Sequence, residues 1–297
     1  MSDLAWDIQT VSEEWLVGFC GRLVKEGKTI RGCFGGDRVI KLSETIVAKF
    51  GIGVMASEAE TQRFACQKVD SKIVYVPQVY RYFHWNDFGY LFMEYVPGRQ
   101  LDELDLDEHT DVITRVAQII KHLGTIESGQ IPGPIGGGQP QGYLWGDNGA
   151  GTTFTSTSDL EDWLNKRLSI RDKSIDLTSH PLVLCHMDLC RRNMILRDDN
   201  TISLVDWGCS GLYPRYFEFA SLSFMMPYDG SSEKPLIQAT ATLMSWTNDD
   251  KELIGLLKLA RAVALRYSLD NENKYGIPES LHSWCPPPML SRSSSPS

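Results

Sequence analysis

Apolar and polar residues near the start of the chain follow first a helical and then a strand-like period. Helical spacing after Ser12, a residue type that commonly caps helices, predicts an amphipathic helix carrying Trp15, Leu16, Phe19, Leu23 and Val24. Two β-rich runs over residues 37–42 and 45–50, separated by two polar residues, predict a hairpin. A helix is expected from near Ser57, and strand-like runs span 73–82 and 90–96. The first 96 residues therefore predict a small α+β lobe on an antiparallel sheet.

The pattern changes after Pro97-Gly98, where an acidic stretch precedes a strong helical stripe over residues 112–123. The loop-rich stretch 129–158 is too long for a simple connector in a compact domain, and such loops are often functional. Further along, the pattern predicts a helix over 159–168, strands over 182–185 and 202–205, and helices over 235–246 and 251–267. A proline- and serine-rich tail over 286–297 is expected to be disordered. We therefore expect an N-terminal lobe over 1–96, a C-terminal lobe over 97–285, and this tail.

Composition narrows the classes of protein to which the chain can belong. The 297 residues carry 29 Lys and Arg against 38 Asp and Glu, a net charge of −9, which argues against a nucleic-acid binder. Seven cysteines form an odd count without a C-x-x-C pair, so we expect a reducing, cytoplasmic setting and no disulfide framework. No run is long and apolar enough for a membrane span, and no signal peptide is indicated.

The most specific motif is H-x-D-x-x-x-x-N over residues 186–193, followed by an apolar strand that ends in Asp206-Trp207-Gly208. Phosphoryl transfer needs a carboxylate that aligns the acceptor and separate oxygen ligands for Mg²⁺. Asp188 is suited to orient a substrate hydroxyl and receive its proton, whereas Asn193 and Asp206 offer hard oxygen ligands for magnesium. His186 is expected to brace the loop backbone rather than to act as a base.

This segment resembles the catalytic and metal-binding loops of the aminoglycoside phosphotransferase family, within the wider protein-kinase-like fold. The continuation over residues 211–220, GLYPRYFEFA, is similar to the fungal-type branch of that family. The resemblance implies Asp188 as the catalytic base, Asn193 and Asp206 as magnesium ligands, and ATP as the phosphoryl donor. It also implies a two-lobed α+β fold, with a small antiparallel-sheet lobe that binds the nucleotide and a larger, mainly helical catalytic lobe.

The N-terminal lobe contains a lysine and a carboxylate of the kind that a kinase needs. Lys49 stands near the end of a strand-like run, the expected context for a lysine that reaches the nucleotide phosphates. Glu58 and Glu60 are both candidates to orient it, but two residues apart they do not share a helix face. Residues 57–60 match a capping box in which Glu60 turns back to the Ser57 amide, which favours Glu58 as the partner of the lysine.

The run Phe92-Met93-Glu94-Tyr95-Val96-Pro97-Gly98 looks like the hinge between the two lobes of this fold. The resemblance assigns adenine recognition to the carbonyl of Glu94 and the amide of Val96. Two features depart from the protein-kinase pattern: the glycine loop is only GCFGGD over 32–37, and no Ala-Pro-Glu sequence or long activation segment follows Asp206. A small-molecule acceptor is therefore favoured over a protein substrate.

The leading hypothesis is an ATP- and Mg²⁺-dependent kinase that phosphorylates a hydroxyl of a small molecule, without nucleic-acid or membrane partners. The acidic cluster over 102–108 allows a cationic acceptor, although a solvated turn whose carboxylates favour the start of the next helix is the preferred explanation. Two alternatives stay open: a catalytically silent kinase-like binding protein and a protein kinase. The sequence does not identify the acceptor.

Overall fold

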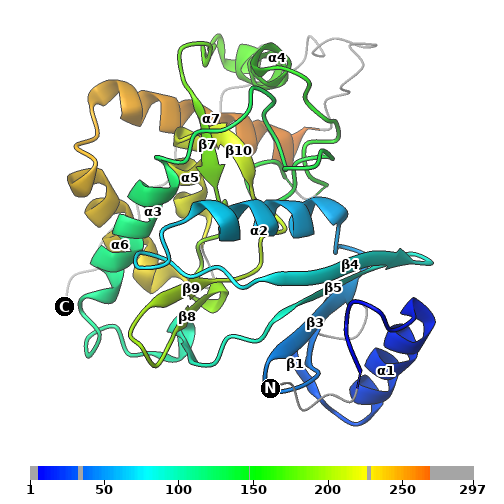
Figure 1. Cartoon of the computed structure of the whole chain (residues 1–297). Helices are drawn as coiled ribbons and strands as arrows, with labels where there is room; N and C mark the ends of the chain where they lie inside the picture. Colours follow the sequence, from blue (N-terminus) through cyan, green and yellow to red (C-terminus); the bar gives the residue numbers. More distant parts are fainter. Residues whose placement is uncertain (1–5, 33–35, 147, 226–228, 268–297) are drawn as a thin grey trace, which may run out of the picture.

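A computed structural model describes residues 6–32, 36–146, 148–225 and 229–267 (Figure 1). Residues 33–35 of the glycine loop, the end of the C-terminal lobe and the expected disordered tail lie outside these residues. Within them, no helix has the length and apolar character that crossing a membrane requires. The division at residues 96 and 285 stays a prediction.

The N-terminal part contains a five-stranded antiparallel sheet in the order β1-β2-β3-β5-β4. Its strands are β1 (Thr29–Gly32), β2 (Arg38–Lys41), β3 (Ile46–Gly51), β4 (Val79–Trp85) and β5 (Phe88–Glu94). The predicted hairpin is confirmed, because β2 pairs antiparallel with β3 and Ile40 stands opposite Ala48. The sequence pattern gave no indication of β1, a short strand whose residues alternate between exposed and half-buried.

Alternation along β3 decides which side chains face helix α1 and which face the opposite side of the sheet. Ile46, Ala48 and Phe50 belong to the apolar cluster beneath helix α1 (Glu13–Lys25), whereas Val47 belongs to the cluster on the opposite face. Successive residues of a strand point to opposite faces, so Lys49 shares the face of Val47. Helix α2 (Ala56–Lys68) runs along that face, between the sheet and the C-terminal helices (Figure 1).

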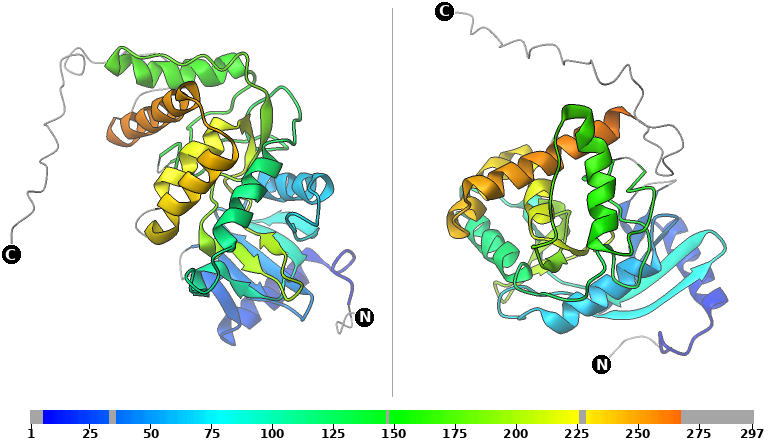
Figure 2. Two further views of the ribbon diagram at one scale, coloured as in Figure 1. Left: turned by 90° about the vertical axis from the view of Figure 1, so that its left-hand side faces the viewer. Right: turned by 90° about the horizontal axis from the view of Figure 1, so that it is seen from above.

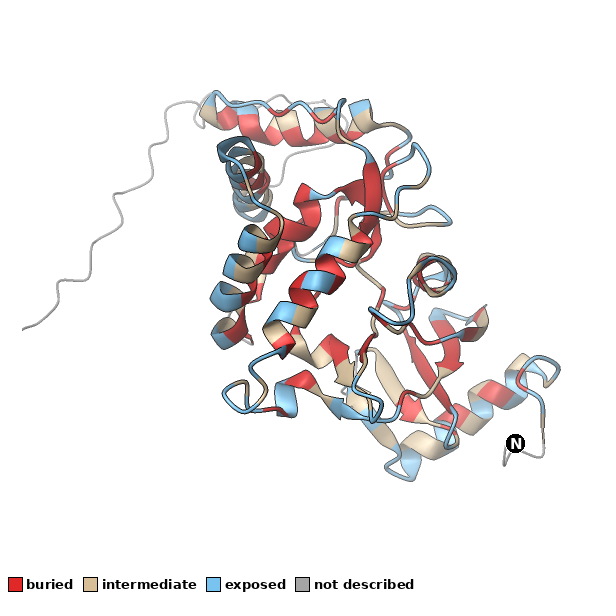
Figure 3. Cartoon of the chain, turned by 60° about the vertical axis from the view of Figure 1, so that its left-hand side comes forward, coloured by how far each residue is buried: buried red, intermediate tan, exposed pale blue. Residues whose placement is uncertain are grey.

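Five helices form most of the C-terminal part: α3 (Val112–Leu123), α4 (Thr157–Leu168), α5 (Tyr216–Ser221), α6 (Gly230–Leu243) and α7 (Asn248–Arg266). Short 3₁₀ segments η1 (Leu101–Glu103), η2 (Ser169–Arg171), η3 (Arg191–Asn193) and η4 (Leu222–Phe224) connect the larger elements. The helices surround one apolar core, and α5 lies at its centre with every residue buried (Figures 2 and 3). The sequence pattern placed the start of α6 at Pro235, but the helix begins five residues earlier. It does so because the amides of Ser232 and Glu233 already bond to the Asp229 carbonyl.

Two small sheets position the motif residues. Strand β7 (Leu182–Cys185) pairs with β10 (Gly211–Pro214), and β8 (Met194–Leu196) lies between β6 (Arg99–Gln100) and β9 (Ile202–Leu204). The two strands predicted to flank the motif are therefore present, but they belong to different sheets. The motif loop passes from one sheet to the other.

The long loop over 129–158 connects the two parts of the molecule. The amide of Ile135 donates to Thr61 Oγ1 on α2 over 3.1 Å, and the Gly133 amide donates to the Leu212 carbonyl of β10 over 3.0 Å. Trp145, near the middle of the loop, is buried in the C-terminal core against Trp163. This loop is therefore packed against both parts of the molecule.

Candidate active site

The motif loop leaves β7 at Cys185 and is held by a buried carboxylate. Glu218, on the central helix α5, accepts hydrogen bonds from the backbone amides of His186 and Met187. Met187 adopts a left-handed backbone conformation with φ of 68°, which is uncommon for a residue other than glycine and therefore strained. Burial raises the pKa of Glu218 to about 7, although the two amide hydrogen bonds counteract it. Charge-assisted bonds from α5 thus fix the turn immediately before Asp188.

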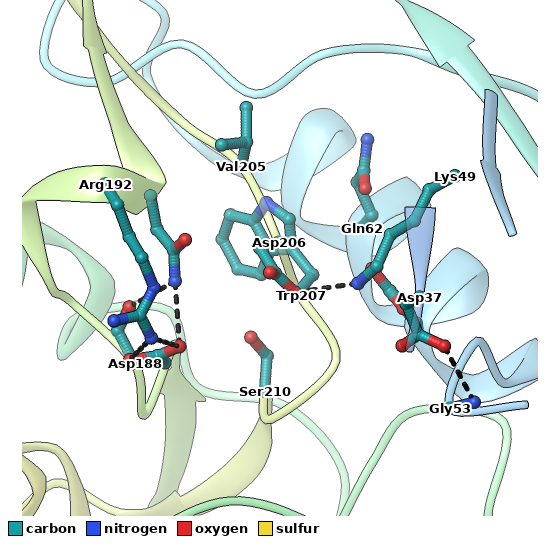
Figure 4. A network of polar contacts seen from close by, with 12 residues as sticks. Asp37, Lys49, Gly53, Gln62, Asp188, Arg192, Val205, Asp206, Trp207 and Ser210 are labelled. Atoms are coloured by element: carbon teal, nitrogen blue, oxygen red, sulfur yellow. Dashed lines mark hydrogen bonds and ion pairs between the residues drawn. The ribbon is translucent and has the colours of Figure 1, made fainter. Parts of the chain in front are cut away.

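Asp188 lies in a cluster of donors from the 3₁₀ turn that follows it. Asn193 Nδ2 donates to the Asp188 carboxylate over 2.8 Å and to its backbone carbonyl over 3.0 Å. Arg192 Nη2 lies 3.2 Å from Asp188 Oδ2, and it also contacts the Tyr143 hydroxyl at 3.4 Å. The Asp188 carboxylate is therefore oriented before any substrate binds (Figure 4).

His186 has the bracing contacts that the sequence suggested. Its Nε2 is 3.2 Å from the Val205 carbonyl, and its Nδ1 is 3.4 Å from the Asp188 amide. The Asp188 amide can only donate, so the ring carries its proton on Nε2. Burial lowers the pKa of His186, which favours this neutral form. The ring connects the motif loop to the strand that leads to Asp206.

Lys49 lies between two carboxylates that are far apart in the sequence. Its Nζ is 2.7 Å from Glu58 Oε1 and 2.8 Å from Asp206 Oδ1 (Figure 4 shows the Asp206 contact). Burial by itself lowers the pKa of Lys49, but the charges of Asp206 and Glu58 outweigh it and raise the pKa above its usual range. Burial raises the pKa of Glu58 to about 7, and Lys49 lowers the pKa of Asp206. Lys49 is therefore charged at neutral pH.

Glu58 and Glu60 occupy opposite environments on α2. Glu58 is buried with Thr61 and Gln62 on the face toward the sheet, whereas Glu60 is exposed and pairs with Arg63. The expected capping box is wrong, because the helix begins at Ala56 after Met55 and places Glu58, not Glu60, in the third helical position. The choice of Glu58 over Glu60 agrees with this geometry for a different reason, the burial of one helix face.

A first cavity of about 290 Å³ lies between the two parts of the molecule. Val39, Val47 and Ile195 are among its apolar lining residues, and Glu94, Tyr95 and Val96 border it along the predicted hinge. The Glu94 carboxylate is turned to the Tyr75 hydroxyl, 2.7 Å away, so this side chain supports the end of β5. Further lining residues are Lys49, Asn193 and Asp206. This cavity combines apolar walls with the charged groups of the motif.

A second, larger cavity of about 830 Å³ shares Lys49 and Asp206 with the first and also contains Asp188 and Arg192. The long loop contributes residues 141–143 and Gly146 to its lining, so the expectation of a functional role for this loop has a structural basis. The acidic cluster over 102–108 is not in this lining. Its members Asp102, Glu103, Asp105, Asp107 and Glu108 are exposed, and Glu103 borders the first cavity.

The oxygen atoms available at the junction of the cavities suit a magnesium ion. Both amide hydrogens of Asn193 are used by Asp188, which leaves its amide oxygen as the acceptor. The Asp206 side chain is 45% exposed, and a carboxylate is a hard oxygen ligand. No group of three or more His, Cys, Asp and Glu suited to a metal occurs among the described residues. Two protein ligands nevertheless suffice where phosphates and waters complete the shell, as is usual for Mg²⁺.

Several residues of the site were not singled out from the sequence. Glu218 is a single carboxylate within the apolar segment 216–220, and an isolated charge of this kind signals a buried partner. Arg191, at a variable position of the motif, donates from Nε to the buried Asp229 over 2.6 Å. Arg192 follows Asp188 by four residues, a spacing that gave no prediction because the segment is not a regular helix.

Comparisons with known proteins show the family and the fold of the chain. Residues 52–249 match the family described as the phosphotransferase enzyme family. The fold is similar to that of a thermostable mutant of aminoglycoside phosphotransferase APH(4)-Ia in its apo form, with a TM-score of 0.55, 14% identity, and coverage of 83% of this chain and 88% of that chain. It is also similar to the type VIII aminoglycoside-3'-phosphotransferase, with a TM-score of 0.50, 14% identity, and coverage of 84% and 100%.

A ternary complex of a thermostable APH(4)-Ia mutant with ADP and hygromycin B has a TM-score of 0.50 and 16% identity, covering 82% of this chain and 87% of that chain. No curated protein matches this sequence. The similar structures support the two-lobed kinase-like fold, and the family match covers about two thirds of the chain. This chain therefore belongs to the phosphotransferase enzyme family, as its motif indicated.

Proposed function

We propose that this protein is a kinase that transfers a phosphoryl group from ATP to a hydroxyl group of a small molecule and requires Mg²⁺. The observation that carries the proposal is the pair of cavities joined at Lys49 and Asp206. One has apolar walls and borders the hinge, and the other contains the oriented Asp188 carboxylate. Such an arrangement can bind a phosphoryl donor in one cavity and a hydroxyl acceptor in the other, with Lys49 and Asp206 between them.

On the donor side, the adenine ring fits between the apolar walls of the first cavity, with the backbone of Glu94 and Val96 as its hydrogen-bonding edge. Lys49 binds the nucleotide phosphates, since the neighbouring carboxylate of Glu58 stabilises its positive charge. Asn193 and Asp206 would be ligands of Mg²⁺, and the bound ion would neutralise negative charge on the phosphates. The ADP found in a complex of a protein with the same fold supports a nucleotide as donor.

On the acceptor side, Asp188 accepts a hydrogen bond from the substrate hydroxyl and aligns its oxygen toward the terminal phosphorus. As the new oxygen–phosphorus bond forms, the hydroxyl proton passes to Asp188, and the bond to the bridging oxygen breaks with its electron pair leaving on ADP. Asn193 and Arg192 keep the carboxylate in place during this transfer.

Magnesium-dependent ADP release with a panel of hydroxylated metabolites tests the proposal, with mass spectrometry to identify the phosphorylated product. We expect Asp188→Asn to lower turnover at least a thousandfold while ATP binding, measured by calorimetry with Mg²⁺, changes less than threefold. The exposed Asp198→Asn is the matched control, with turnover unchanged. Full activity of Asp188→Asn would remove this residue from the mechanism.

The same measurements separate the alternative functions. Absence of ATP binding with any divalent cation would favour a silent kinase-like binding protein. Phosphate incorporation into generic protein substrates, without transfer to any metabolite, would favour a protein kinase.

A further inference from the structure

Apolar side chains gather at the rim of the second cavity. Ile52 is 64% exposed, Met55 46%, Tyr143 41% and Leu265 45%, and all four line this cavity. They are four of the nine exposed large hydrophobic residues in the described part of the chain. Single exposed apolar residues are ordinary on protein surfaces, but a group of them around a cleft marks a binding site.

Three distant segments contribute these side chains. Ile52 and Met55 stand in the turn between β3 and α2, Tyr143 lies in the long loop, and Leu265 lies in the last turn of α7. Tertiary packing therefore brings the apolar rim together around the cavity that contains Asp188. Arg261 Nε of α7 donates to the Tyr143 carbonyl over 2.6 Å, which connects α7 to the long loop.

The charged residues that line the cavity are balanced in sign, so they attract a cationic ligand only weakly. Its carboxylates are Asp37, Glu58, Asp188 and Asp206, and its cations are Arg31, Lys49, Arg192 and Arg261. Lys49 is within ion-pair distance of Glu58 and Asp206, and Arg192 is within that distance of Asp188. Asp37 accepts a hydrogen bond from the Gly53 amide at 3.0 Å, on the side of the glycine loop. A polycation would therefore have to compete with cations that the protein itself supplies.

We propose that the acceptor is an amphiphilic alcohol without positive charge. Its hydroxyl lies at Asp188, and its apolar body rests against Ile52, Met55 and Leu265. This inference rests on the proposed function, because it assigns the second cavity to the acceptor. It favours a different substrate class from the cationic acceptor that the acidic cluster allowed, since that cluster lies outside the cavity lining.

Matched acceptors test the inference through transfer. Glucose, glucosamine and octyl β-glucoside, kept below its micelle concentration, share most hydroxyl groups and differ by a positive charge or an apolar chain. With Mg²⁺ and ATP, we expect kcat/KM for octyl β-glucoside to exceed that for glucose and for glucosamine at least tenfold. Preference for glucosamine, or for the aminoglycoside kanamycin, would overturn the inference and leave the proposed function intact.

A binding measurement does not depend on turnover. With a non-hydrolysable ATP analogue and Mg²⁺ occupying the first cavity, we measure calorimetric binding of octyl β-glucoside to the wild type and to Ile52→Asn/Leu265→Asn. We expect the double variant to weaken binding at least tenfold. Ile131→Asn is the matched control, because Ile131 is 60% exposed and does not line the cavity, and its binding should change less than twofold.

Two results with the double variant would overturn the inference. Equal binding by the wild type and the double variant would show that the rim does not contact the apolar chain. A change from dimer to monomer in the double variant, measured by light scattering, would show that the rim is an interface between copies of the chain. If octyl β-glucoside binds as expected but no acceptor is phosphorylated, the proposed function fails while the assigned ligand class stands.

Discussion

Glu218 is the residue whose replacement tests the architecture of the site most directly. It is 3% exposed, and both of its carboxylate oxygens accept backbone amides of the motif loop. Glu218→Gln keeps the shape and one acceptor oxygen, but turns an amide NH₂ toward a backbone N–H. The variant therefore removes the charge and one hydrogen bond that hold the loop before Asp188.

The stability effect follows from the raised pKa of Glu218. Burial raises that pKa from its ordinary 4.5 to about 7, so between pH 4.5 and pH 7 the folded protein binds a proton that the unfolded chain releases. The contribution of Glu218 to the free energy of unfolding therefore falls as pH rises through this window, by about 3 kcal/mol at most, and is constant above it. Glutamine does not titrate, so the variant lacks this loss.

Urea unfolding of the two proteins at pH 5 and pH 8 measures the effect. We expect similar stabilities at pH 5, where Glu218 is protonated in the folded wild type, and a variant more stable by about 2–3 kcal/mol at pH 8. Turnover should nevertheless fall about ten- to hundredfold with little change in KM for ATP, because Asp188 is less well positioned. Glu127→Gln, at an exposed glutamate, is the control and should change neither quantity.

Parallel stability profiles for the wild type and Glu218→Gln from pH 5 to pH 8 would refute the assignment of a raised pKa to Glu218. Unchanged turnover would refute its role in positioning the loop.

Two further replacements test the ion pairs that hold the site. Glu58→Gln should lower kcat/KM for ATP at least about tenfold, because Lys49 loses its buried partner, whereas Glu60→Gln should change it less than twofold in the same steady-state assay; equal effects would contradict the pairing. Arg191→Ala leaves the buried Asp229 carboxylate without its cation and should lower the free energy of unfolding in urea by about 3–5 kcal/mol. Replacing the exposed Lys234 of α6 by alanine provides the control and should cost less than about 0.5 kcal/mol; a similar loss in both variants would argue against a buried ion pair.

Local patterns in the sequence predicted the elements that carry the site. The hairpin and six of the helices were predicted from hydrophobic periodicity, which depends only on neighbouring residues. Helix α5, which carries Glu218, was not predicted, because all six of its residues are buried and leave no polar face. The same alternation places Lys49 on a defined face of β3. The misplaced start of α6 and the wrong capping box at α2 have a common cause, since helix ends depend on which backbone groups find partners.

The sequence by itself determined the two-lobed fold and the family, because a short motif with fixed spacing places the candidate site residues within one segment of the chain. It also showed that Lys49, Asp188, Asn193 and Asp206 follow one another in the order typical of this fold. Only the tertiary structure decided which groups meet. It pairs Lys49 with Asp206, 157 positions later, and anchors His186 on Glu218, 32 positions later. It also gathers the apolar rim from three segments of the chain. Such contacts arise from the packing of distant elements around a common core, and no periodicity within one element encodes them.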